Sequence, residues 1–287
     1  INWINSWVGH YGCSLVVFTV FIKLVLLPLD FKSRKSMRRM NSVQPKVAVL
    51  QKKYANDKDK LNQKMSELYR KEKINPLSGC VPMLVTFPVL FIMFAAMRYV
   101  ANLELAKQTL QIISGAVENE LPMEGWLWVK NLWMPDSPWA TVVADQANLQ
   151  MIPADIWQKA IDALSVTTPN LVQTLGLEGL NLADTLKSNT AFFYEKLIQM
   201  PLYQQEMTRW AALPELNLLV FKLTFYQNPN GFFVLPILAA VTQFLMTKLT
   251  PTAPTGAEGT PQAGTGKFMQ WFFPIFSLWI CSSYNAA

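Results

Sequence analysis

The chain has 287 residues, of which 51% are hydrophobic and only 15% charged, and it carries a net charge of +6. Soluble domains contain about 25% charged residues, so this composition argues against a soluble enzyme or binding domain and indicates a membrane protein. The single histidine excludes a histidine-based metal cluster, and three scattered cysteines give no disulfide framework.

Four apolar stretches have the length and hydropathy expected of membrane-spanning helices. They predict an all-α polytopic membrane protein, organised as a helical bundle. In chain order we expect an external N-terminal segment with the first span (1–29), a basic cytoplasmic helical hairpin (30–75), a second span (76–100), an extracytoplasmic loop (101–228) with a helical insert at about 137–227, a third span (229–248), a flexible cytoplasmic linker (249–266) and a fourth span (267–287).

The orientation follows from the uneven distribution of charge. Residues 30–73 hold fourteen basic and five acidic side chains, a net charge of +9. Residues 101–228 hold seven basic and thirteen acidic side chains, a net charge of −6. Because loops rich in Lys and Arg stay in the cytoplasm, the basic segment is predicted inside, and the N-terminus and the acidic segment outside.

Two segments outside the spans have helical periodicity. In the basic segment, apolar residues recur at spacings of three and four on both sides of Asn56, which predicts two short antiparallel helices. The basic surface of this hairpin fits either a solvated face or a surface that binds a partner, anionic lipid or RNA. In the insert, helices are predicted near 153–164, 180–187, 189–200 and 202–212.

Lys23 lies inside the first apolar stretch, which has no other ionisable side chain between Ser14 and Leu29. A lysine at the centre of a spanning helix costs roughly 2.5 to 3.5 kcal/mol, so such residues normally face a bundle interior or a wet cavity. Snorkelling toward the cytoplasmic headgroups is the alternative, because Lys23 is only seven residues from Asp30. We favour a functional role.

Each predicted span also contains uncharged polar side chains, and no Asp or Glu lies inside any of them. A single such residue usually makes a hydrogen bond between helices. Together with an unpaired cation, they predict a hydrated groove. Its candidate residues are Lys23, Thr19, Thr86, Gln243 and Ser277.

Several strings in the sequence resemble the YidC-type membrane protein insertases. They are FTVFIKLVLLPLDFKSRKSMRRMNSVQPKVAVLQKKY, NPLSGCVPMLVTFPVLFIMF, NGFFVLPILAAVTQFLMTKLTP and KFMQWFFPIFSLWI. The combination of NPLSGC with MRRMNSVQPK is the most specific part. The resemblance covers residues 1 to about 136 and 228–287.

The resemblance implies a membrane protein insertase and folding chaperone in the bacterial plasma membrane, without an enzymatic reaction, metal or cofactor. In that family the first core span carries a cation, most often Arg, in a hydrophilic groove open to the cytoplasm and to lipid, and Lys23 falls at that position. The implied partners are nascent membrane proteins, the ribosome, the Sec translocon and membrane lipids, without recognition of a nucleic-acid sequence. The cytoplasmic hairpin would present Arg38, Arg39, Lys46, Lys52 and Lys53.

The sequence departs from the family pattern in three ways. Lys replaces the commoner Arg at position 23, about ninety residues enlarge the external loop, and four spans are predicted where the family core has five. Two other functions stay open at this point. One is a small-solute channel or transporter with Lys23 as an anion site, and the other is a membrane-anchored scaffold that displays the insert.

Overall fold

The computed structural model describes residues 2–72, 81–116, 123–168, 171–176, 190–209, 216–218, 221–249 and 271–281. The chain divides into two compact units. The first unit comprises Ile1–Val8, Cys13–Met93 and Leu238–Leu278, and the second comprises Gly9–Gly12, Phe94–Ile237 and Trp279–Ala287.

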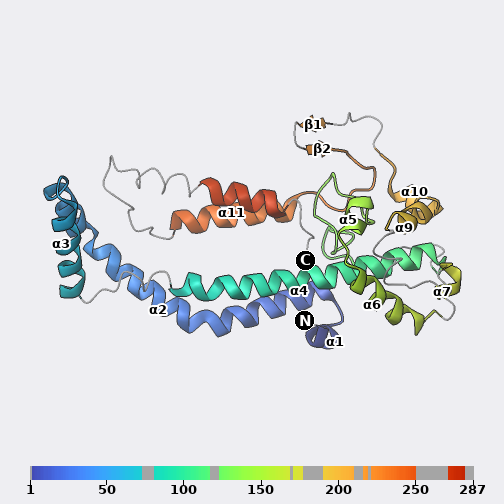
Figure 1. Cartoon of the computed structure of the whole chain (residues 1–287), viewed down its shortest axis with the longest axis horizontal. Coiled ribbons are helices and arrows are strands. Elements are labelled where there is room, and N and C mark those ends of the chain that lie inside the picture. The colour runs from blue at the N-terminus through green and yellow to red at the C-terminus, as the bar shows by residue number, and fades with distance from the viewer. Residues whose placement is uncertain are drawn as a thin grey trace. The chain divides into compact units, whose positions relative to one another are not determined.

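The first unit is helical, and its longest helices are apolar over much of their length (Figure 1). It contains α1 (Asn2–Val8), nearly all of α2 (Tyr11–Lys53), α3 (Lys58–Lys71) and parts of α4 (Val81–Ile113), α11 (Val234–Leu249) and the helix Trp271–Cys281. In α2 and α4, only 11% and 22% of the most apolar stretch is buried. The core helix of a soluble protein would be mostly buried, so these exposed apolar surfaces are those expected in a lipid bilayer.

The helix α2 continues without a break for 43 residues and passes through Pro28 and Pro45. The sequence predicted two short helices around Asn56, whereas the first of them is the end of this long helix. Pro removes one backbone N–H and crowds the carbonyl four residues earlier, so the helix loses one hydrogen bond at each Pro and then resumes. The apolar span and the basic segment after it therefore share one helix.

The C-terminal part of α2 packs against α3. Val43 and Val47 are buried in a small core with partly buried Met65, Leu68 and Tyr69. The carboxylate of Asp57 accepts a hydrogen bond from the Lys60 backbone N–H at 3.1 Å, which caps the N-terminus of α3. The helical pairing predicted around Asn56 thus has a physical basis in this apolar contact, and its cytoplasmic location stays a prediction.

The second unit has a core built around the end of α4. This helix extends thirteen residues beyond the predicted end of the second span at Val100, and Leu105, Ala106 and Leu110 in this extension are almost fully buried. Shorter helices complete the unit: α5 (Gln146–Gln150), α6 (Ala154–Ser165), α7 (Leu171–Thr174), α9 (Thr190–Leu197) and α10 (Pro201–Glu206). Trp157 of α6 is fully buried and stacks on Phe193 of α9, with ring centroids 5.1 Å apart.

The class predicted from the sequence is confirmed in its main features, because the described residues are predominantly helical and include apolar helices. The insert nevertheless contains a short antiparallel sheet of β1 (Leu216–Leu218) and β2 (Phe221–Leu223), in which Asn217 pairs with Lys222. In its described residues the insert therefore combines helices with one short sheet. Of the predicted helices, that at 180–187 lies outside the described residues, and those near 153–164, 189–200 and 202–212 correspond to α6, α9 and the shorter α10.

A buried amide network joins the two ends of the insert. The side-chain amide of Asn230 donates to the carbonyls of Asn131, Met134 and Pro135 at 2.9–3.0 Å, and its oxygen accepts from the Asn131 backbone N–H at 2.7 Å. The Asn230 backbone N–H donates to the carbonyl of Ala140 at 3.0 Å. The chain therefore leaves toward the insert and returns from it at adjacent backbone positions.

Asp136 holds the N-terminal turn of α11. Its carboxylate accepts hydrogen bonds from the backbone N–H groups of Phe233 and Leu235, at 3.1 and 2.7 Å, and from the Trp128 indole at 3.1 Å. Phe233 has a φ of 65°, a conformation that is costly for a residue other than glycine and that these bonds offset. At Gly231, an added Cβ would overlap the Asp136 carboxylate, so this close approach requires glycine.

Candidate functional site

One face of α2 carries polar side chains through its apolar stretch. Lys23 and Thr19 are four residues apart, one turn along this face, and both side chains are exposed. Among the residues that the structure describes, neither has a hydrogen-bond or ion-pair partner on another element. Within the described residues, the Lys23 ammonium therefore has no carboxylate at ion-pair distance.

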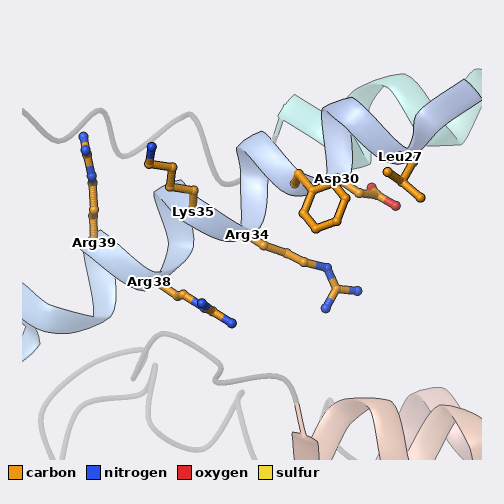
Figure 2. A pocket seen from close by; sticks show the side chains of 7 residues that line it. Leu27, Asp30, Arg34, Lys35, Arg38 and Arg39 are labelled. Carbon is orange, nitrogen blue, oxygen red and sulfur yellow. The ribbon is translucent and has the colours of Figure 1, made fainter.

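An open cavity of about 860 Å³ begins one turn after Lys23 on the same helix. Its described lining residues all come from α2 and recur at helical spacing: Leu27, Asp30, Phe31, Arg34, Lys35, Arg38 and Arg39. Figure 2 shows Arg34 and Arg38 extending from one side of the helix, and Lys35 and Arg39 from the other. The lining changes along the helix axis from apolar to strongly cationic.

The five basic residues predicted for the hairpin fall into three groups. Arg38 and Arg39 line the α2 cavity. Lys46 donates from its ammonium to a Glu72 carboxylate oxygen at 2.6 Å, and this contact lowers the pKa of Glu72 from its ordinary value. Lys52 and Lys53 are exposed in the last turn of α2, where positive charge interacts favourably with the helix dipole.

The other predicted groove residues lie on separate helices. Gln243 is exposed on α11 and Ser277 is half-buried on Trp271–Cys281, whereas the side chain of Thr86 lies outside the described part of the structure. No hydrogen bond within the described ranges joins Lys23 or Thr19 to Gln243 or Ser277. The hydrophilic groove therefore stays a prediction.

Reasoning from the sequence missed the α2 cavity. It placed the basic residues in a helical hairpin separate from the span and did not place them on a helix continuous with the span. The sequence did contain a usable signal. The lining residues from Leu27 to Arg39 are separated alternately by three positions and by one, and this spacing continues the period of the helix past Pro28.

Comparison with known proteins decides the family. Residues 3–287 match the family model described as 60Kd inner membrane protein. The chain belongs to the 60Kd inner membrane protein family. The resemblance to YidC-type proteins inferred from the sequence is thereby confirmed.

Relatives of this chain are named membrane protein insertase YidC. The relative from Fusobacterium nucleatum is 47% identical over 98 residues, which cover 34% of this chain and 48% of the relative. The relative from Chlorobaculum parvum is 36% identical over 136 residues, which cover 47% of this chain and 20% of the relative. The relative from Geobacter sulfurreducens is 38% identical over 119 residues, which cover 42% of this chain and 22% of the relative. The matched stretches thus span less than half of each relative. The family and its bacterial relatives support a location in the bacterial plasma membrane.

Proposed function

We propose that the chain inserts nascent membrane proteins into the bacterial plasma membrane, with Lys23 as the cation that attracts the acidic residues of the arriving segment. The observation that carries the proposal is the position of Lys23, exposed on an apolar helix and without an ion-pair partner in the described residues. Family membership supports the same function.

The physical basis is the cost of a charge in an apolar environment. A lysine at the centre of a membrane helix costs roughly 2.5 to 3.5 kcal/mol, and water or a substrate carboxylate reduces that cost. A carboxylate about 4 Å from the ammonium gains roughly 4 kcal/mol at an effective dielectric constant of 20, against about 1 kcal/mol in bulk water. Lys23 would therefore attract acidic residues most strongly where water is sparse.

The proposed groove adds polar side chains from the other spans to Lys23. Thr19, Thr86, Gln243 and Ser277 would hydrate the polar part of a substrate while its apolar part moves into lipid. In this mechanism the polar surface lowers the barrier to crossing, and no covalent bond changes.

The proposed topology has four spans, with the N-terminus and residues 101–228 outside and the α2–α3 pair in the cytoplasm. The net charges of +9 for residues 30–73 and −6 for residues 101–228 support this orientation. The α2–α3 pair would then meet the ribosome, the Sec translocon or an emerging nascent chain, because it presents exposed basic side chains on the cytoplasmic side.

The test compares Lys23→Glu and Lys23→Arg in the full chain, reconstituted in proteoliposomes with ribosome-bound nascent membrane proteins. Protease protection measures insertion, and a photocrosslinker at position 23 reports contact with the nascent chain. We expect at least about a tenfold loss for Lys23→Glu, since reversing one charge exceeds the 1.4 kcal/mol that corresponds to a factor of ten, and near-normal insertion for Lys23→Arg.

Two results would overturn the proposal. One is normal insertion by Lys23→Glu, and the other is the absence of crosslinks from position 23 to a nascent chain. Arg70→Glu, a charge reversal on an exposed face of α3, is the control for a general electrostatic effect. Saturable anion flux that depends on Lys23 would instead favour a channel or transporter.

A further inference from the structure

We propose that Glu124 and Trp126 are positioning residues for Lys23, because they hold the first turn of the helix that carries it. This inference rests on the proposed role of Lys23 in insertion and concerns what fixes its position. The first two residues of α2, Tyr11 and Gly12, belong to the second unit, as does the loop that contacts them. The contacts between them therefore lie within one compact unit.

The carboxylate of Glu124 caps the N-terminus of α2. It accepts a hydrogen bond from the Tyr11 backbone N–H at 2.6 Å. The first N–H groups of a helix have no partner within the helix, and a negative charge at this end also interacts favourably with the helix dipole. The Glu124 carbonyl in turn accepts from the Leu132 N–H at 2.9 Å, which fixes the capping residue to the loop behind it. The cap thus opposes sliding of α2 along its axis.

The indole of Trp126 packs on the backbone of α2 at Gly12. A Cβ added at Gly12 would overlap the Trp126 indole, so this close contact requires glycine. On the preceding residue, the Tyr11 ring meets the Trp133 ring edge-on, with ring centroids 5.2 Å apart. Successive residues of an α-helix point in directions about 100° apart, so contacts to both of them oppose rotation of the helix.

The loop that carries Trp126 is held in one conformation. Trp126 and Val129 exchange two backbone hydrogen bonds, at 2.9 and 3.0 Å, which close a two-residue turn. Leu127 in this turn has a φ of 55°, a conformation that is costly for a large side chain and that persists only where the surrounding contacts enforce it. Strain of this kind is concentrated at functional sites. Here the strained turn holds the Trp126 ring against the start of α2.

The helix α2 carries this constraint to Lys23. Lys23 lies eleven residues after Gly12 in the same helix, roughly 16 Å farther along its axis. The first proline of α2 is Pro28, which comes after Lys23, so no proline interrupts the helix between the two positions. A change of one residue in the register of the first turn moves every later residue by about 1.5 Å and rotates it by about 100°. The position of Lys23 therefore depends on contacts made at the start of α2.

The test measures the depth of α2 in the bilayer and the insertion activity of the same protein. In the full chain, the three native cysteines are replaced by serine and a spin label is attached at Leu24→Cys, an exposed position next to Lys23. The protein is reconstituted in phospholipid vesicles, and power-saturation EPR with oxygen and a water-soluble nickel chelate gives the depth of the label. We expect Trp126→Ala to move the label by about 1.5 Å or more, the rise of one residue.

The expected loss of insertion follows from the distance dependence of the Coulomb attraction. Lengthening an ammonium–carboxylate separation from about 4 to about 5.5 Å weakens the attraction by a factor of roughly seven at an effective dielectric constant of 20. Insertion of ribosome-bound nascent chains should therefore fall by up to about sevenfold in Trp126→Ala. Glu124→Ala should act in the same direction. Glu124→Gln keeps an oxygen that accepts the Tyr11 hydrogen bond, so it should retain the label depth.

Two controls separate positioning from a general loss of structure. Trp139→Ala removes another half-buried tryptophan of the second unit, whose ring packs on Phe233 with centroids 4.8 Å apart, and it should leave the label depth unchanged. Gly12→Ala displaces the Trp126 ring, so on its own it should move the label. Added to Trp126→Ala it should have no further effect, because both changes act through the same contact.

Three results would contradict this assignment. An unchanged label depth in Trp126→Ala and Glu124→Ala would show that these contacts do not position α2, and an equal shift in Trp139→Ala would show a general disturbance of the unit. A shifted label with normal insertion would show that the position of Lys23 does not limit insertion. The proposed function is tested separately, because normal insertion by Lys23→Glu overturns it whatever the depth of the label.

Discussion

The change Asp136→Asn tests whether the carboxylate that holds α11 needs both of its oxygens. Oδ1 accepts from the Phe233 N–H, whereas Oδ2 accepts from the Leu235 N–H and the Trp128 indole. An amide keeps the shape but has only one accepting oxygen. In its better orientation it retains the two bonds of Oδ2 and turns its NH₂ group toward the Phe233 N–H.

The expected loss of stability follows from these three bonds. The partly buried Phe233 N–H loses its acceptor, which costs about 1 to 3 kcal/mol. The two remaining bonds lose the contribution of the negative charge at a helix N-terminus, about 0.3 to 1 kcal/mol. The sum is about 1.3 to 4 kcal/mol. For a unit of this size each kcal/mol corresponds to about 2–4 °C, so we expect the melting temperature to fall by roughly 3–16 °C.

The assay is thermal unfolding of the full chain in detergent, followed by tryptophan fluorescence, with hydrogen exchange at Phe233 and Leu235 as the local readout. Asp145→Asn is the matched control. Asp145 caps α5 with a single oxygen that accepts from the Asn148 backbone and side chain, at 2.8 and 2.7 Å, and Asn caps helices as well as Asp does. Equal shifts for the two variants, or unchanged exchange in Asp136→Asn, would refute the reasoning.

Three further changes have defined outcomes. Gly231→Ala places a Cβ on the Asp136 carboxylate and should lower the melting temperature of the full chain at least as much as Asp136→Asn, whereas an unchanged melt would contradict the close approach. Burial raises the pKa of Tyr203 above its ordinary value of 10.0, so its neutral form stabilises the fold below about pH 10 and this contribution is lost at higher pH. Tyr203→Phe should therefore flatten the decline in melting temperature between pH 9 and pH 11, and a decline identical to wild type would count against it. Val47→Ala removes two buried methyl groups from the α2–α3 contact and should destabilise that pair by about 1–2 kcal/mol, measured by faster hydrogen exchange in α3 with unchanged exchange in α6.

The sequence alone determined the membrane class and the apolar helices. These features depend on composition and on the local order of residues, because hydrophobic length and charge require no knowledge of distant contacts. The family was also predictable, since its motifs are continuous strings such as MRRMNSVQPK. The topology and the role of Lys23 remain predictions of the same kind.

The tertiary structure decided features that depend on residues far apart in the chain or on the balance of competing local effects. Asn131 and Asn230 are 99 residues apart, and no local pattern indicates that they share a buried network. The β1–β2 pair arises within an insert whose neighbouring segments are helical. Pro28 lies inside α2, and the hydrogen bonds on either side of it sustain one helix. Only that continuity places Leu27, Phe31 and the basic residues on one helix.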